Sequence, residues 1–99
     1  MIDVMMRLRV KDYPHWKKVF DKAETFRRER GEAAFELYQA AHDSGDLVLL
    51  FRWDEMGVAR DFFDAAETRR LWDQGGILGD PEVTFLKLVD RGEAFGRKH

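Results

Sequence analysis

The sequence predicts an α+β fold of the ferredoxin-like type, with the element order β-α-β-β-α-β and a four-stranded antiparallel sheet that carries its helices on one face. Residues 2–10 alternate apolar and polar side chains, as a half-buried strand does. A helical pattern and a second strand follow them. The third strand, the second helix and the fourth strand occupy residues 47–89. Right-handed crossovers place both helices on the same face of such a sheet.

The first half of the chain begins with the strand over residues 2–10. Asp12 is a typical N-cap residue, and Pro14 suits the first turn of the helix that follows. Gly31 predicts the end of this helix, and residues 33–39 form a second strand. The apolar side chains of the helix recur at spacings of three and four residues, and they are Tyr13, Trp16, Val19, Phe20, Ala23 and Phe26.

The second half begins after a predicted turn at residues 42–46. Residues 47–53 form a strand that is apolar on both faces. A helix begins near Asp54 or Glu55, presents Phe62 to the core, and breaks at Asp64 and Ala65. We expect a short turn over residues 68–74 and a last strand over residues 83–89. Residues 1–90 are then one domain, and residues 91–99 form a loose C-terminal tail.

The predicted helices cover only one face of the sheet, but the last two strands carry apolar side chains on both faces. Leaving several Leu, Val and Phe side chains in water costs several kcal/mol, at about 25 cal/mol per Å². A second copy of the chain is the simplest cover for the open face. We therefore expect a homodimer whose two sheets face each other.

Composition excludes several classes of function. The net charge is −2, from 17 basic and 19 acidic residues, whereas nucleic-acid-binding domains carry a basic excess. The basic cluster at residues 27–30 falls at a predicted helix C-terminus, where cations stabilise the helix dipole. No apolar run approaches the length of a membrane span, and charged residues interrupt the first ten positions where a signal peptide would be apolar. We expect a cytoplasmic protein that binds neither nucleic acid nor membrane.

Metal and cofactor chemistry finds little support. The chain has no cysteine, so disulfides, thiolate metal sites and a cysteine nucleophile are excluded. Acidic and histidine side chains at helical spacing, as in Asp12 with His15 and Asp61 with Asp64, are usually solvated. We expect neither metal nor cofactor, and we expect His42 and His99 to be solvated.

Three tryptophans are more than a core of this size requires. Trp16, Trp53 and Trp72 can serve as core packing or as the flat walls of a planar ligand site, and the sequence leaves both open. Arg7, Arg9 and Arg52 project from strands. They need carboxylate partners such as Asp3 or Glu36, or an anionic ligand.

Three segments resemble the dimeric α+β barrel superfamily, near the antibiotic biosynthesis monooxygenase domains. They are VKDYPHWKKVFD, LLFRWDEMGVARDFF and GILGDPEVTFL, and the resemblance spans about residues 2–89. It implies a dimer and a pocket in each subunit between helices and sheet. The cofactor-free oxygenases of this group use an asparagine, a tryptophan and an arginine, but the chain contains no asparagine. The haem-degrading branch uses a histidine in the second helical region, and no histidine lies between Asp43 and Lys98.

Two functional hypotheses follow. In the first, the dimer binds a planar aromatic or anionic compound and is a candidate cofactor-independent monooxygenase or cyclase. The candidate catalytic residues are His15 and Tyr38 for proton transfer and Arg52 for holding an oxyanion. The candidate ligand-binding residues are Arg7, Trp16, Trp53, Phe62 and Trp72.

In the second hypothesis, the protein is a non-enzymatic dimeric ligand sensor or structural module whose aromatic residues all belong to the core. A fully packed interior and carboxylate partners for all three strand arginines would favour it.

Overall fold

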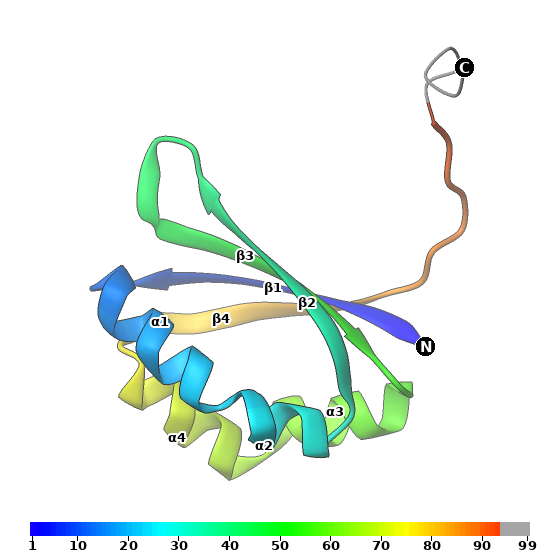
Figure 1. Cartoon of the computed structure of the whole chain (residues 1–99), viewed down its shortest axis with the longest axis horizontal. Coiled ribbons are helices and arrows are strands. Elements are labelled where there is room, and N and C mark those ends of the chain that lie inside the picture. The colour runs from blue at the N-terminus through cyan, green and yellow to red at the C-terminus, as the bar shows by residue number, and fades with distance from the viewer. Residues whose placement is uncertain (94–99) are drawn as a thin grey trace.

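The computed structural model describes residues 1–93 as a sheet with helices on one face (Figure 1). The elements in chain order are β1 (Ile2–Val10), α1 (Tyr13–Lys22), α2 (Glu24–Glu29), β2 (Glu32–Ala40), β3 (Asp43–Trp53), α3 (Met56–Asp64), α4 (Ala66–Gln74) and β4 (Ile77–Leu86). The four strands are antiparallel in the order β2-β3-β1-β4. The predicted ferredoxin-like α+β fold is confirmed.

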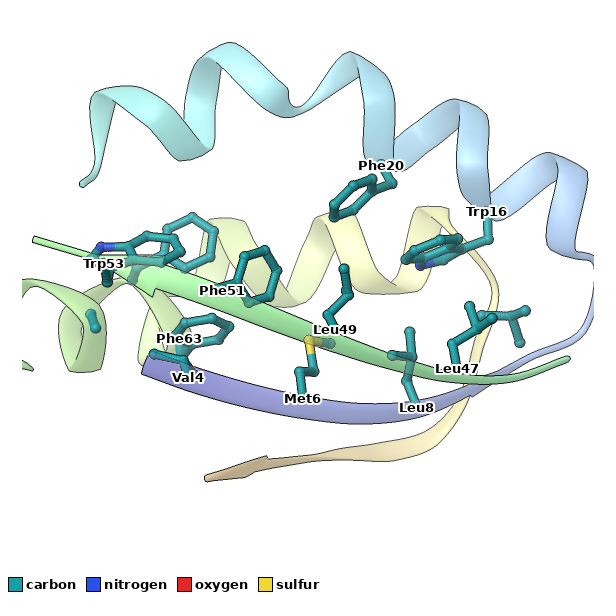
Figure 2. Close-up of a cluster of buried hydrophobic side chains, with 13 residues drawn as sticks. Val4, Met6, Leu8, Trp16, Phe20, Leu47, Leu49, Phe51, Trp53 and Phe63 are labelled. Atoms are coloured by element: carbon teal, nitrogen blue, oxygen red, sulfur yellow. The ribbon is translucent and has the colours of Figure 1, made fainter. Parts of the chain in front are cut away.

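The core lies between the helices and the two central strands, β1 and β3. Every second residue of these strands is buried beneath the helices, so one sheet face is almost wholly apolar. Figure 2 shows Trp16 and Phe20 extending from α1 toward these side chains. The buried strand residues are Val4, Met6, Leu8 and Val10 of β1 and Leu47, Leu49, Phe51 and Trp53 of β3.

The first helix begins as the sequence predicts but is divided in two. The Asp12 side chain accepts a hydrogen bond from the His15 backbone N–H (3.2 Å), and Pro14 lies in the first turn. At Ala23 the backbone N–H is shared between the carbonyls of Val19 and Phe20, both at 3.2 Å. This tightened turn separates α1 from α2, although the two follow each other closely along the sheet (Figure 1).

The break at Asp64 and Ala65 is confirmed, but the turn predicted for residues 68–74 is wrong. This segment belongs to the helix α4. Leu71 and Trp72 lie three and four residues after Thr68, so the three residues together form the inner side of a helix. The pattern is too short to stand out in sequence, because fewer than three turns separate Ala65 from Gly75.

The strand boundaries of the second half also differ from expectation. β3 begins at Asp43 instead of residue 47, since the hairpin turn is shorter than predicted. The last strand is Ile77–Leu86 and not residues 83–89. It runs through Gly79 and Pro81, because the β1–β4 pairing shifts register between Arg7 and Arg9 and absorbs the extra residues. Proline is tolerated there because β4 is an edge strand.

Residues 87–93 continue from β4 without regular structure and lead away from the sheet (Figure 1). The rest of the predicted tail, residues 94–99, lies outside the described residues, and so does the expectation for His99. In the described part of the chain, no helix is both long and apolar enough to cross a membrane.

Gly31 allows the chain to turn from α2 into β2 directly beside a buried tryptophan. Its φ is +111°, a conformation that favours glycine. A Cβ at this position would lie 2.6 Å from Trp53 Nε1. That indole is fixed, because its N–H donates a 2.8 Å hydrogen bond to the Arg30 carbonyl.

We predict that Gly31→Ala destabilises the fold more than Gly76→Ala, as measured by urea unfolding. Gly76 also has a positive φ (+75°), but a Cβ there meets nothing within 4 Å. Backbone strain alone costs about 1–2 kcal/mol. Gly31→Ala adds overpacking against Trp53, which costs about 1–3 kcal/mol. Equal losses in the two variants would contradict the close approach of Gly31 to the indole.

Candidate functional site

A small cavity of about 50 Å³ lies between the helices and the sheet. A single internal water needs roughly 10–15 Å³ on this measure, so the space holds a few waters or one small chemical group. Its walls are mainly apolar and aromatic. They are formed by Met6, Trp16, Val19, Phe20, Ala23, Arg27, Leu49, Phe51, Phe62, Phe63, Thr68, Leu71 and Trp72.

Arg27 lies near the end of α2 and lines this cavity. It is the one cationic residue of the described cavity wall. The residue is only 4% exposed. Its Nε donates to Glu32 Oε2 at 2.6 Å, and its Nη1 donates to the Phe20 carbonyl at 2.7 Å. The guanidinium carbon lies 3.7 Å from the centre of the Phe20 ring, a cation–π contact. Nη2 is buried without a hydrogen-bond partner.

Glu32, the first residue of β2, is the counter-ion of Arg27 and is itself buried (6% exposed). Burial raises the pKa of the Glu32 carboxyl above its ordinary value of 4.5. The hydrogen bond and the charge of Arg27 lower this pKa, but the desolvation effect is larger. With Glu32 ionised, the pair carries no net charge.

Thr68 is the second polar residue of the cavity wall, and its hydroxyl is already engaged. Oγ1 donates to the Phe62 carbonyl at 2.6 Å. The backbone N–H of Ala65 donates to the same carbonyl. Thr68 therefore stabilises the bend between α3 and α4. Because of this bend, Phe62 of α3 and Trp72 of α4 line the same cavity.

A wider groove of about 480 Å³ lies beside the cavity, between the α1–α2 segment and α4. The two spaces share Val19, Ala23 and Leu71. These three side chains are thus the partition between the buried cavity and a surface groove. The remaining groove residues are Lys22, Phe26, Glu67, Arg70 and Gln74, so its rim is charged.

The predicted ligand-binding residues lie in three different places. Trp16, Phe62 and Trp72 line the cavity. Trp53 is fully buried beside Phe62, with ring centres 4.8 Å apart, but is not part of the cavity wall. Arg7 lies on the sheet face opposite the helices, which we call the outer face.

Arg52 and Tyr38 are also on the outer face, and the three strand arginines all have carboxylate partners. Arg7 pairs with Asp46 (3.1 Å), Arg9 with Asp43 (3.0 Å) and Arg52 with Asp3 (3.3 Å). The hydrogen bond from the backbone N–H of Gly45 lowers the pKa of Asp43, and the hydrogen bond from Arg9 lowers this pKa to a smaller extent. Tyr38 is 50% exposed. These residues are not brought together with the cavity.

His15 lies at the end of the helical layer. Its Nε2–H donates a 2.8 Å hydrogen bond to the Gln74 carbonyl, which links the start of α1 to the end of α4. It is exposed and does not line the cavity. Catalytic roles for His15, Tyr38 and Arg52 therefore stay predictions. Residues 1–93 contain no cluster of three His, Asp or Glu side chains that is suited to a metal ion.

Sequence reasoning missed Arg27, because it interpreted residues 27–30 as a basic cluster that stabilises the dipole at a helix C-terminus. The signal that identifies it is spacing. Trp16, Phe20, Ala23 and Arg27 recur at intervals of four, three and four, so Arg27 continues the buried side of the helical segment. Glu32 is five residues further on, across the turn at Gly31, and its burial follows from that of its partner.

No protein-family model and no curated protein matches the chain. Solved structures do match it. SnoaB, a cofactor-independent oxygenase from Streptomyces nogalater, aligns with a TM-score of 0.75 at 12% identity, over 91% of this chain and 94% of its own. An antibiotic biosynthesis monooxygenase aligns with a TM-score of 0.70 at 18% identity, over 91% and 100%.

This chain has the fold of the antibiotic biosynthesis monooxygenases. Rv0793 from Mycobacterium tuberculosis has it too, with a TM-score of 0.65 at 20% identity over 93% of this chain and 98% of its own. The resemblance noted in three sequence segments is thereby confirmed for the fold. At sequence identities of 12–20%, similarity to antibiotic biosynthesis monooxygenases shows the fold alone.

We predict that Glu32→Gln changes how stability depends on pH. Because burial raises the Glu32 pKa, the folded protein holds this proton more tightly than the unfolded chain. The contribution of Glu32 to the unfolding free energy falls as pH rises from about 4.5 through the raised pKa, and is constant above it. Urea unfolding between about pH 4 and pH 8 measures this. On acidification through that window, the parent should gain stability relative to Glu32→Gln; a relative loss would contradict the raised pKa.

Proposed function

We propose that this protein binds a small, flat and largely apolar molecule between its helices and its sheet. The observation that carries the proposal is the cavity itself, an aromatic space with one buried cation at its wall. Ligand sites are mostly apolar and hold a few well-placed polar groups. Trp16 and Phe20 stack with ring centres 4.9 Å apart and planes at 21°, which offers a flat aromatic surface.

The groove beside α1 and α4 is the proposed route by which the ligand enters the cavity. The cavity alone, at about 50 Å³, is smaller than the roughly 300–1,000 Å³ of typical ligand pockets. The neighbouring groove of about 480 Å³ is separated from it only by side chains. Rotation of Val19 and Leu71 joins the two spaces, so a bound molecule extends from the cavity toward the groove.

Oxygenase or cyclase chemistry is a further step beyond binding. SnoaB has the same fold and is a cofactor-independent oxygenase, which motivates the question. As far as residues 1–93 describe them, the cavity walls carry no carboxylate and no imidazole that could remove a proton from a substrate. We therefore propose binding as the function, and oxygen uptake with a bound compound as the test of monooxygenase activity.

We predict that planar aromatic compounds raise the melting temperature of the parent and not of Ala23→Leu. A compound at 100 times its Kd stabilises the fold by about 2.7 kcal/mol, a shift of several degrees. Leucine at position 23 fills the partition between cavity and groove. Ala66→Leu, at an exposed residue of α4 that lines neither the cavity nor the groove, is the matched control and should respond like the parent. Equal shifts in all three proteins would exclude this cavity as the site.

We also propose that two copies pair through their outer faces. Met5, Val48 and Leu50 form the centre of this face and remain only partly buried in one chain. The ion pairs of the strand arginines surround them, and Tyr38 and Leu78 are half-exposed (50% and 52%). An apolar centre within a charged rim is typical of protein interfaces. A second copy presents the same surface.

We predict that Leu50→Asp converts the dimer to a monomer, as measured by analytical ultracentrifugation. The parent should sediment at twice the mass of one chain. The new carboxylate would be buried without a partner at the centre of the interface, which opposes association. Met56→Asp introduces the same charge at an exposed apolar residue of α3 and should leave the dimer intact. A parent that sediments as a monomer would overturn the pairing.

A structural or sensor role without catalysis has one specific observation in its favour. All three strand arginines have carboxylate partners, so none is left to hold an anionic substrate. The interior is not fully packed, however, since the cavity remains. A dimer that binds aromatic compounds without consuming oxygen would support the hypothesis of a non-enzymatic ligand sensor.

A further inference from the structure

We propose that Arg27 Nη2 is the donor that recognises an uncharged carbonyl oxygen of the bound molecule. The inference rests on the proposed function, because it assigns the ligand class of the same cavity. Among the described residues, none of those predicted from sequence to bind a ligand places a buried polar atom without a hydrogen-bond partner at the cavity wall. Arg27 does, from the wall of the cavity.

The donor groups of Arg27 are unequally used. A guanidinium has five N–H groups. One on Nε is taken by Glu32 and one on Nη1 by the Phe20 carbonyl, whereas buried Nη2 has no partner among the described residues. Buried donors are almost always satisfied in folded proteins, because an unmet one is costly. The unused donor is therefore the feature of this cavity that needs an acceptor from outside the chain.

The guanidinium is also held rigidly. Hydrogen bonds to Glu32 and to the Phe20 carbonyl fix its plane, and the Phe20 ring lies 3.7 Å from its central carbon. Phe35 lies further off, at 5.6 Å. A donor fixed in this way loses little side-chain entropy when it binds, which favours selective recognition.

Charge balance selects a carbonyl over a carboxylate. Glu32 already neutralises Arg27, and no other cationic residue lines the described cavity. A carboxylate ligand would bring an uncompensated negative charge into an apolar space. A ketone, aldehyde or ester carbonyl accepts the same hydrogen bond without that charge. The ligand is thus a planar apolar molecule with one carbonyl group at its buried end.

An ordered internal water is the rival acceptor, since the cavity has room for one. The two readings differ in what the protein selects. A water satisfies Nη2 in every state of the protein, so a carbonyl on the ligand gains nothing. A vacant donor makes the carbonyl compound bind more tightly than its hydrocarbon analogue.

The test compares indanone, indane and indane carboxylate, which share one ring system, by titration calorimetry on the whole chain. We expect indanone to bind the parent about 10-fold more tightly than indane, as one hydrogen bond from a charged donor provides. The infrared carbonyl stretch of bound indanone should move to lower frequency. In Arg27→Met with Glu32→Met the affinity ratio should fall to about one, and the infrared shift should disappear.

The double variant avoids leaving Glu32 buried and unpaired, and apolar replacement of a buried ion pair is often tolerated. Arg27→Lys is a second variant, which keeps the charge beside Glu32 but lacks Nη2, and it should also lose the preference for indanone. Arg28→Met is the matched control. Arg28 is exposed, pairs with Glu24, and should not alter the ratio.

Each other outcome overturns the inference in a distinguishable way. Equal affinity of indane and indanone for the parent would leave an aromatic binding site and remove the role of Arg27. A preference for indanone that survives in the double variant would assign the carbonyl to another group. Tightest binding of the carboxylate would exclude the uncharged ligand. No binding of any compound would remove the proposed function together with this inference.

Discussion

The buried pair of Arg27 and Glu32 connects the helical layer to the sheet. It spans the turn at Gly31, where α2 ends and β2 begins. Two buried charges cost desolvation energy that their attraction repays only with good geometry, and here the 2.6 Å hydrogen bond and the Phe20 contacts provide it. Removing either partner alone would strand the other charge in an apolar space. The position of α2, and hence the part of the cavity wall that α2 forms, depends on this contact.

The sheet separates two kinds of chemistry. The face beneath the helices is aromatic and aliphatic, and the buried pair of Arg27 and Glu32 is its one ion pair within residues 1–93. The outer face places arginines and aspartates around a small apolar centre. Strand alternation makes this division unavoidable, because neighbouring residues such as Leu49 and Leu50 must point to opposite faces. The proposed ligand site and the proposed contact between copies therefore lie on opposite faces of the sheet and can change independently.

Much of the fold could be predicted because periodicity is a local signal. The even-numbered residues of β1 are all apolar, and Asp12 with Pro14 determines where α1 begins. The prediction failed where tertiary contacts override local pattern. Residues around Gly79 and Pro81 have the composition of a loop, yet pairing with β1 on both sides of them keeps them within β4. Arg27 could not be identified from residue type, since arginine is usually solvated and only its spacing from Trp16 and Phe20 indicates burial.

The irregular stretch of β4 makes this edge of the sheet a poor template for strand addition. An edge strand with free N–H and C=O groups is a template for uncontrolled strand addition. Pro81 removes one of these donors, and Gly79, with a φ of +70°, turns the backbone out of regular pleating. Both interruptions blunt this edge as a site for endless polymerisation. Association through this edge is thus disfavoured, whereas the proposed contact between outer faces is closed and symmetric.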